Sequence, residues 1–240
     1  MQTEAGLGIA APGSGQARPP LPLPLLCRWA AALLLTAPDA GGLAAYRTPE
    51  GRAFLDALGA DPALAPVGAT LADLVAPGVD LHASADRITL AHSRAFLMGG
   101  MRAIPPYASV WLSPRGLLWQ EPAQAMARLL AACGLSVDPS TPEPPDHLGV
   151  QLDLLATLVE QEAAGMAPVI GAAEFTRDHL LNWLPLLAAA SDRMREPFLY
   201  PDLIRGITAV LNDVVADDPA GADRRRGPAP QPLTHGGDKS

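Results

Sequence analysis

The segment that follows Asp146 carries apolar residues at a helical spacing, and this pattern constrains the fold more than any other part of the chain. Its apolar residues recur at steps of four, three and four, at Leu148, Leu152, Leu155 and Val159. Such steps place side chains on one face of an α-helix, and polar residues occupy the positions between them. The pattern therefore predicts a long helix with one buried face, running to about Ala164.

A proline-rich phrase stands directly before this helix. Pro142, Pro144 and Pro145 keep the chain extended, so that Asp146 occupies the position of an N-cap. An aspartate there accepts hydrogen bonds from free N–H groups and places a negative charge at the positive end of the helix dipole. We expect Asp146 to cap the helix, with a role in chemistry as the alternative. His147 is either a general base, a metal ligand or a partner for a neighbouring loop.

A second phrase lies upstream, after Pro105 and Pro106. Adjacent prolines cannot continue a helix and favour an extended conformation in the residue before them. Residues 107–111 are therefore predicted to form a loop or a short extended piece. Tyr107 and Trp111 on such a segment would be available for contacts.

Together the two phrases resemble the TorD/DmsD family of cytoplasmic chaperones for molybdenum-cofactor redox enzymes. The matching residues are PYASVWL at 106–112, Gly-Leu at 134–135 and EPPDHL at 143–148, in the order and at about the separation found in that family. A His-Leu-x-x-Trp phrase at 179–183 also matches. Trp111 is similar to the form found in the DmsD branch. Residues 117–120, Leu-Leu-Trp-Gln, depart from the family pattern.

The resemblance implies a cytoplasmic chaperone and no enzymatic activity. Such a chaperone binds the twin-arginine signal peptide, the apo form of a molybdoenzyme precursor, or both, assists cofactor insertion and delays export until folding is complete. Components of the twin-arginine translocase are further expected partners, and the chain would be a monomer or a homodimer. One alternative is an assembly factor for the mature part of a non-exported molybdoenzyme. Another is a helical small-molecule binder, which would have a buried cavity without acidic rim residues.

Peptide recognition would require carboxylates for the two guanidinium groups beside an apolar groove. The carboxylate candidates are Asp146, Glu143 and Asp153. The resemblance implies a peptide-binding set made of Tyr107, Ser109, Trp111, Glu143, Asp146, His147 and Leu148. For these residues to act together, the two phrases must meet in space, which their spacing alone does not establish.

Composition favours an all-α, single-domain helical bundle of roughly eight to ten helices. The 240 residues suffice for one domain with a sizeable core, and strand-forming aromatics are scarce, at three Tyr, four Phe and four Trp. Glycine- and proline-rich ends predict a disordered extension over 1–19 and a disordered tail over 217–240, around a helical domain at 20–216. Two cysteines form neither a disulfide framework nor a metal-binding spacing.

Several functions are disfavoured by the sequence. A net charge of −8 and a pI near 5.0 argue against nucleic acid, which requires a basic face. The apolar run from Leu21 to Ala37 opens with prolines and contains Arg28, so we expect a core helix there and no stable membrane insertion. Catalytic and nucleotide-binding motifs are missing, and the sequence predicts no catalytic residue, metal site or cofactor.

The other elements follow from local signals. A break between two helices is expected at residues 39–42. Thr48 is expected to cap a helix that begins at Pro49. Residues 61–78 are expected to be loose, with two short helices. A longer helix should run from Asp80 or Ser84 to Met98, with Leu90 and Leu97 among its buried residues. Helices are also predicted over 122–133, over 175–187 with a kink at Pro185 and with Leu186 on the apolar face, and over 201–215.

Overall fold

The computed structural model describes residues 21–98, 103–137, 143–194 and 198–217. Within these ranges the chain forms eleven α-helices and no β-strand. The helices are α1 (Leu23–Leu35), α2 (Ala40–Ala45), α3 (Pro49–Ala60), α4 (Ala65–Leu74), α5 (Leu81–His92), α6 (Ala108–Leu112), α7 (Glu121–Ala132), α8 (Leu148–Ala163), α9 (Ala172–Phe175), α10 (Leu184–Ser191) and α11 (Tyr200–Ala216). π-helical turns, Ser93–Leu97 and Thr176–Leu180, extend α5 and α9. The predicted all-α bundle is confirmed, with one helix more than expected.

The predicted end segments fall almost entirely outside the described residues, which begin at Leu21 and end with Asp217, the C-cap of α11. The division into two tails and a domain therefore stays a prediction. Across the described ranges, no helix combines the length and the apolar character needed to cross a bilayer.

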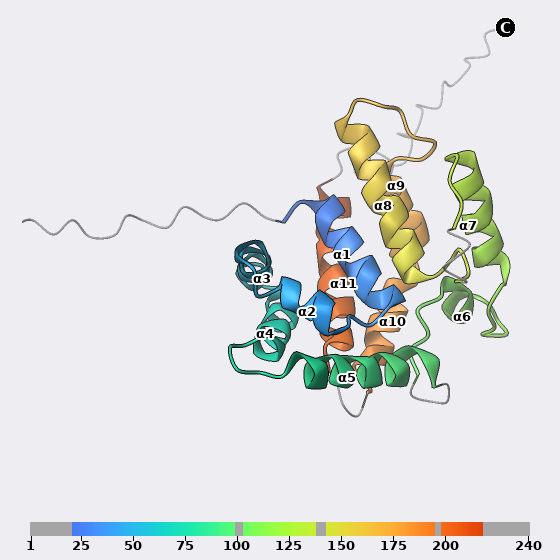
Figure 1. The fold of residues 1–240 in the computed structure, drawn as a ribbon. Helices are drawn as coiled ribbons and strands as arrows, with labels where there is room; N and C mark the ends of the chain where they lie inside the picture. The colour runs from blue at the N-terminus through green and yellow to red at the C-terminus, as the bar shows by residue number, and fades with distance from the viewer. Residues whose placement is uncertain (1–20, 99–102, 138–142, 195–197, 218–240) are drawn as a thin grey trace, which may run out of the picture.

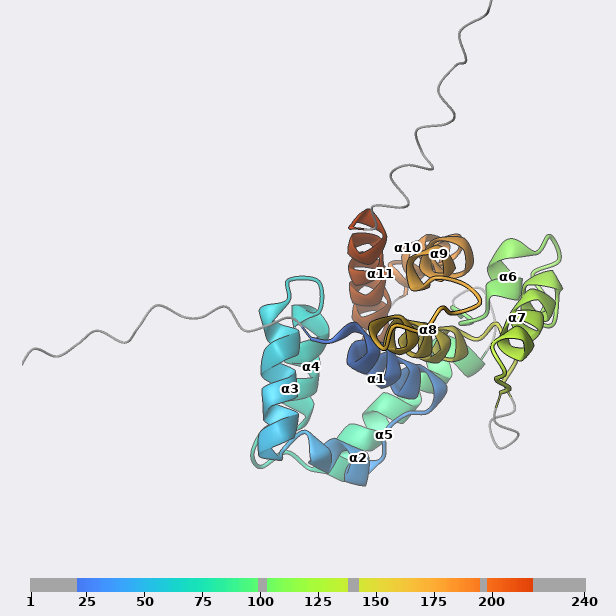
Figure 2. The same cartoon turned by 90° about the horizontal axis from the view of Figure 1, so that it is seen from above.

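Helices α1 and α8 lie side by side at the centre of the molecule (Figures 1 and 2). The stripe predicted on α8 lies in the core, where Leu152 and Leu155 are fully buried. On the surface, the Arg28 guanidinium of α1 binds the carboxylates of Asp153 and Glu160 of α8, each at 2.7 Å. These side chains are about half exposed, and such ion pairs contribute at most about 1 kcal/mol. Apolar burial therefore dominates the α1–α8 contact.

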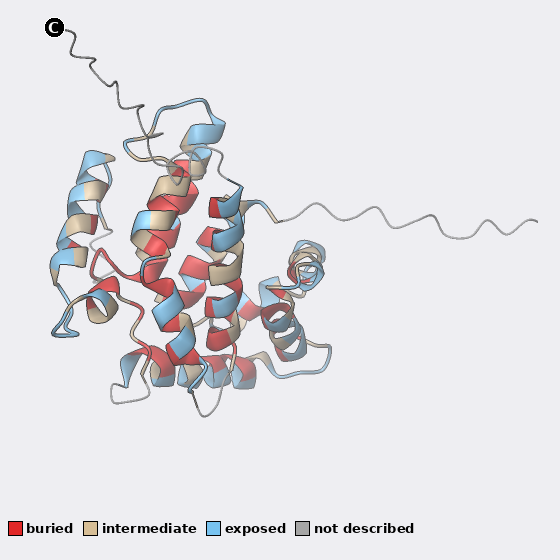
Figure 3. Cartoon of the chain, turned by 180° about the vertical axis from the view of Figure 1, so that it is seen from behind, coloured by how far each residue is buried: buried red, intermediate tan, exposed pale blue. Residues whose placement is uncertain are grey.

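Two helix pairs flank this centre. The α3–α4 pair lies on one side and the α6–α7 pair on the other, while α5 runs across one end and α10 packs on α11 (Figures 1 and 2). Helix α7 lies at the edge of the molecule (Figure 1), and only Ala123, Met126 and Leu130 are buried in it. Much of its surface is exposed (Figure 3).

Local signals place several helix starts as predicted. The Thr48 hydroxyl accepts a hydrogen bond from Gly51 N at 3.1 Å and caps α3, whose first turn contains Pro49. The Asp80 carboxylate accepts one from His82 N at 2.9 Å and caps α5. Pro185 coincides with an interruption of the helix predicted for 175–187, since α10 begins at Leu184 and places the proline in its first turn.

The expectation for residues 39–78 was wrong in two places. The predicted break at 39–42 contains the start of α2, because the Asp39 carboxylate accepts a hydrogen bond from Gly42 N at 2.7 Å and caps a short helix despite its two glycines. Residues 61–78, expected to be loose, contain the single helix α4. Its first turn carries Pro66, which a helix tolerates at that position.

Three leucines expected in the core are exposed. Leu90 stands two residues after the buried Ile88, which corresponds to about 200° around an α-helix, so it does not share the buried face. Leu97 ends the π-helical turn, where the α-helical spacing used for the prediction does not hold. Leu186 lies beyond the interruption at residues 181–183, and α10 does not continue the face that buries Phe175. Trp183, also assigned to that face, is fully buried.

Candidate functional site

The two sequence phrases meet in the structure. Leu148 N donates a hydrogen bond to Pro106 O at 2.7 Å, and Ala108 N donates one to Asp146 O at 3.2 Å. Between these bonds Tyr107 and His147 form an isolated antiparallel bridge. The start of α8 therefore holds the start of α6 by direct backbone pairing, which the spacing of the phrases could not establish.

The aromatic phrase itself differs from the prediction. Tyr107 is extended, as expected, but the residues after it form the short helix α6 instead of a loop. The two prolines restrict only the residues up to Pro106, and the chain is free to turn once the bridge has fixed Tyr107. Trp111 therefore projects from a helix, and its Nε1 donates to Pro105 O at 2.8 Å.

Asp146 caps a helix, but not the one predicted. Its side chain is fully buried, and Oδ2 accepts a hydrogen bond at 2.7 Å from the N–H of Ser109, in the first turn of α6. The N-cap of α8 is His147. The Nε2 of Gln151 donates to Asp146 O at 2.8 Å and fixes this junction from the side of α8.

His147 is held as a neutral acceptor. Its Nδ1 accepts a hydrogen bond from Gly149 N at 3.0 Å, and its ring forms a T-shaped pair with Tyr107, with 5.0 Å between centroids. Burial, and secondarily the proximity of His92, lowers the pKa of His147 to about 3. At neutral pH the imidazole is therefore uncharged, and its Nδ1 lone pair is occupied by the cap.

Tyr107, Trp111 and Glu143 form the accessible edge of the junction, since each is only half-buried. The Tyr107 hydroxyl donates to Glu143 Oε2 at 2.7 Å. Burial and the adjacent Glu143 carboxylate raise the pKa of Tyr107 above its ordinary value, which keeps the hydroxyl protonated. Ser109, Asp146, His147 and Leu148 lie beneath this edge and are almost completely buried. All seven candidate residues therefore belong to one junction, in an outer and an inner layer.

The loop between α6 and α7 adds an apolar surface next to this edge. Leu117, Leu118 and Trp119 are exposed, with Trp119 at 59%. Trp119 has a φ of 59°, a left-handed conformation that is rare for a bulky residue. The loop is anchored to the site because Gln120 N donates to Ser109 Oγ at 3.2 Å. In the sequence this segment departs from the family pattern. Its adjacent apolar residues were the feature that could have indicated an exposed apolar surface.

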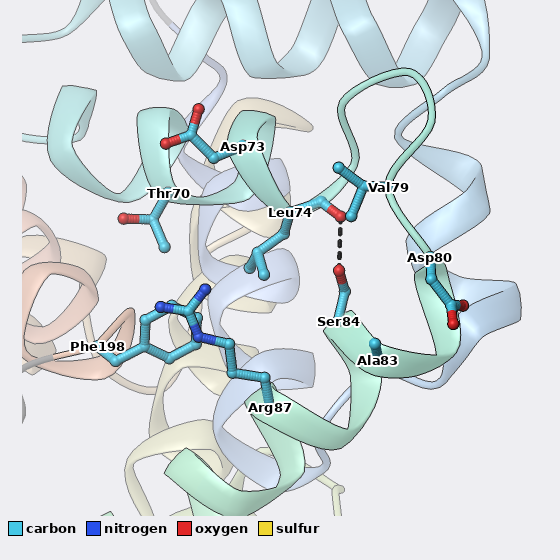
Figure 4. Close-up of a pocket in the computed structure, with 9 residues that line it drawn as sticks. All are labelled: Thr70, Asp73, Leu74, Val79, Asp80, Ala83, Ser84, Arg87 and Phe198. Carbon is cyan, nitrogen blue, oxygen red and sulfur yellow. Dashed lines mark hydrogen bonds between the residues drawn. The ribbon is translucent and has the colours of Figure 1, made fainter.

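A hollow of about 490 Å³ lies between α4 and α5 (Figure 4). Most of its polar groups serve the local structure. Asp80 caps α5, the Ser84 hydroxyl donates to Leu74 O at 2.8 Å, and the Arg87 guanidinium lies 4.2 Å from the ring centroid of Phe198. The hollow has two carboxylates, so it does not match the cavity expected of the small-molecule alternative. In the described part of the chain, no cluster of His, Cys, Asp or Glu side chains is arranged to hold a metal ion.

Comparison with known proteins identifies the family. Residues 60–189 match the family described as nitrate reductase delta subunit. The chaperone protein TorD of Vibrio parahaemolyticus is 32% identical over 152 residues, covering 61% of this chain and 71% of that protein. The chain belongs to the TorD family. The TorD of a Vibrio cholerae serotype O1 strain is 31% identical over 166 residues, covering 67% of this chain and 75% of that protein.

A solved structure shares the fold of this TorD-family chain. It is described as a candidate redox enzyme maturation protein from Archaeoglobus fulgidus, and it aligns with a TM-score of 0.50 at 20% identity over 85% of this chain and 98% of that one. The matches to the family model and to the TorD proteins confirm the predicted family membership. The relatives compared above are named TorD, and the assignment to the DmsD branch stays a prediction.

Proposed function

We propose that this chain is a cytoplasmic chaperone that binds the twin-arginine signal peptide of a molybdenum-cofactor oxidoreductase, holds the precursor while its cofactor is inserted, and delays its export. Membership of the TorD family supports the general role. The proposal of signal-peptide binding rests on the junction of α6 with α8. There the two distant phrases meet and leave an aromatic and acidic edge accessible.

The chemistry of this edge suits such a peptide. A twin-arginine signal peptide presents two guanidinium groups followed by an apolar, helix-prone segment. The Glu143 carboxylate accepts a bond from Tyr107 and retains acceptor capacity for a guanidinium, which forms strong charge-assisted bonds. The exposed side chains of Leu117, Leu118 and Trp119 offer apolar contact to the segment that follows. The net charge of −8 favours the approach of a cationic peptide.

Within the proposed peptide-binding set, the two layers act differently. Tyr107, Trp111 and Glu143 contact the peptide, whereas the buried Ser109, Asp146, His147 and Leu148 hold the backbone that presents them. Because the Asp146 carboxylate is enclosed and bonded to Ser109, its removal would disturb the edge through α6. Among the three carboxylate candidates Asp153 already pairs with Arg28 and Asp146 is buried, so Glu143 is the one proposed to bind a guanidinium.

Calorimetric titration tests the proposal, using a synthetic peptide with two adjacent arginines followed by a leucine-rich segment. We expect binding that weakens about tenfold when both arginines become lysines, since lysine lacks the planar fork. Glu143→Gln preserves an acceptor for Tyr107 and removes the charge, and it should weaken binding about five- to tenfold. Glu50→Gln, at an exposed acid of α3, is the matched control and should leave the Kd unchanged.

A different result would favour the second candidate. The family match to nitrate reductase delta subunits supports an assembly factor for the mature part of a non-exported molybdoenzyme. Binding of a folded or apo enzyme that lacks a signal peptide, with no heat of binding for the arginine peptide, would replace the present proposal by that one.

A further inference from the structure

A small hollow lies behind the accessible edge, among α6, α7, α8 and the π-helical turn at 176–180. Its volume is about 160 Å³. The lining residues are Ala108, Leu112, Glu121, Pro122, Ala125, Met126, Gln151, Asp178, His179 and Asn182. Pockets for whole small molecules have about 300–1,000 Å³, so this hollow has the size for a single side chain.

Gln151 lines the hollow and carries an unused acceptor. The residue is completely buried, and its Nε2 is engaged by Asp146 O at 2.8 Å. Its Oε1 is also buried and has no hydrogen-bond partner among the described residues. Leaving a buried polar atom unpaired costs free energy. A donor that entered the hollow would remove this cost.

Two carboxylates stand at the rim. Asp178 is exposed, and Glu121, in the first turn of α7, is exposed and forms a surface ion pair with Arg128 at 3.3 Å. Both lie near His179, whose pKa burial lowers while the two acids oppose that shift. The rim is therefore negative and the nearest imidazole is held toward its neutral form.

The walls between rim and floor are apolar. Leu112 of α6 and Pro122, Ala125 and Met126 of α7 line them. An arginine side chain matches this order of groups, since its methylene stem packs on apolar surface while its guanidinium offers five donors. A lysine ammonium is a compact and strongly hydrated charge, which is costlier to bring to a buried amide oxygen.

We infer that this hollow receives one arginine side chain of the bound peptide, with its stem between Leu112 and Met126, its guanidinium bonded to Gln151 Oε1 and its charge stabilised by the Asp178 carboxylate at the rim. The inference rests on the proposed function and adds a subsite to it. Glu143 at the accessible edge is left to the second arginine.

The test is a double-mutant cycle by calorimetry with the full chain. One peptide has two arginines, and two others carry citrulline at the first or the second arginine, which preserves shape and removes charge. Asp178→Asn should weaken the binding of the two-arginine peptide about tenfold. It should leave the binding of the peptide with citrulline at the inserted position unchanged. Gln151→Met should act in the same direction. Asp86→Asn, at an exposed acid of α5, is the matched control.

The outcomes separate the two proposals. If the unaltered protein binds the two-arginine peptide but Asp178→Asn weakens all three peptides equally or none, the hollow is not the subsite and the proposed function stands. If the unaltered protein binds none of the peptides, both proposals fail. If Gln151→Met does not fold, a nuclear magnetic resonance measurement takes its place. The signal to follow is that of the side-chain amide of Asn182, which lies at the same rim. It should shift with the two-arginine peptide and not with the matching citrulline peptide, and an unchanged resonance contradicts the subsite.

Discussion

Single residues at the junction show what sequence reasoning can and cannot supply. Asp146 is of the residue type that caps helices, and it does cap one, but its carboxylate reaches Ser109 of α6 instead of the helix that follows it. Which N–H lies within bonding distance depends on how distant segments are packed, and a local pattern does not contain that information. His147 took the cap position of α8, where spacing alone had left it ambiguous.

The same residue makes stability depend on pH. The pKa of His147 is about 3 in the folded chain and near 6.5 in an unfolded one. As pH falls below 6.5, the unfolded chain binds a proton that the folded chain excludes, so this contribution to stability is complete above pH 6.5 and is lost as the pH falls toward 3. Between about pH 7 and pH 5 the loss is about 2 kcal/mol.

Urea unfolding of His147→Asn provides the measurement, since asparagine caps helices without titrating. The free energy of unfolding of the unaltered protein should fall by about 2 kcal/mol more than that of the variant over this range. Parallel pH profiles for the two proteins would contradict a neutral, buried His147.

At the scale of the helices, the periodicity of apolar residues predicted the buried face correctly where a helix was regular and failed where it was not. The apolar stripe of α8 and the starts of α3 and α5 followed from the sequence. The interruption at residues 181–183 divided a face that had been read as continuous, and it left Leu186 exposed. Such irregularities arise from packing against neighbours and leave no clear pattern in a single sequence.

The close approach of α1 to α8 makes a prediction with an internal control. A Cβ at Gly149 would lie 2.7 Å from Leu35 Cγ and 3.1 Å from Ala31 O, so Gly149→Ala should destabilise the protein by about 1–3 kcal/mol. A Cβ at Gly59 in α3 meets nothing within 4 Å, and Gly59→Ala should stabilise by up to about 1 kcal/mol. Opposite signs in thermal unfolding are expected, and equal signs would argue against this α1–α8 packing.

For the whole molecule, the helical class followed from composition, whereas the arrangement of helices did not. Nothing in the sequence indicates that α1 pairs with α8, because the bond from Arg28 to Asp153 spans 125 residues. The outer position of α7 was equally unforeseen (Figures 1 and 3).

Hydrogen exchange should reproduce this arrangement. Amides of α8, surrounded by core residues, should exchange roughly 100-fold more slowly than those of α7, which buries only three side chains. Mass spectrometry of peptic fragments over 148–163 and 121–132 measures the difference. Equal protection of both helices would show that α7 is held as firmly as the centre.

The pairing of α1 with α8 also has a consequence for biosynthesis. A ribosome releases α1 early, yet α8, against which it packs, is complete only when residues up to Ala163 have left the exit tunnel. During that interval the nascent chain exposes a leucine-rich helix. A protein proposed to shield an unfinished client therefore passes through an unfinished state of the same kind.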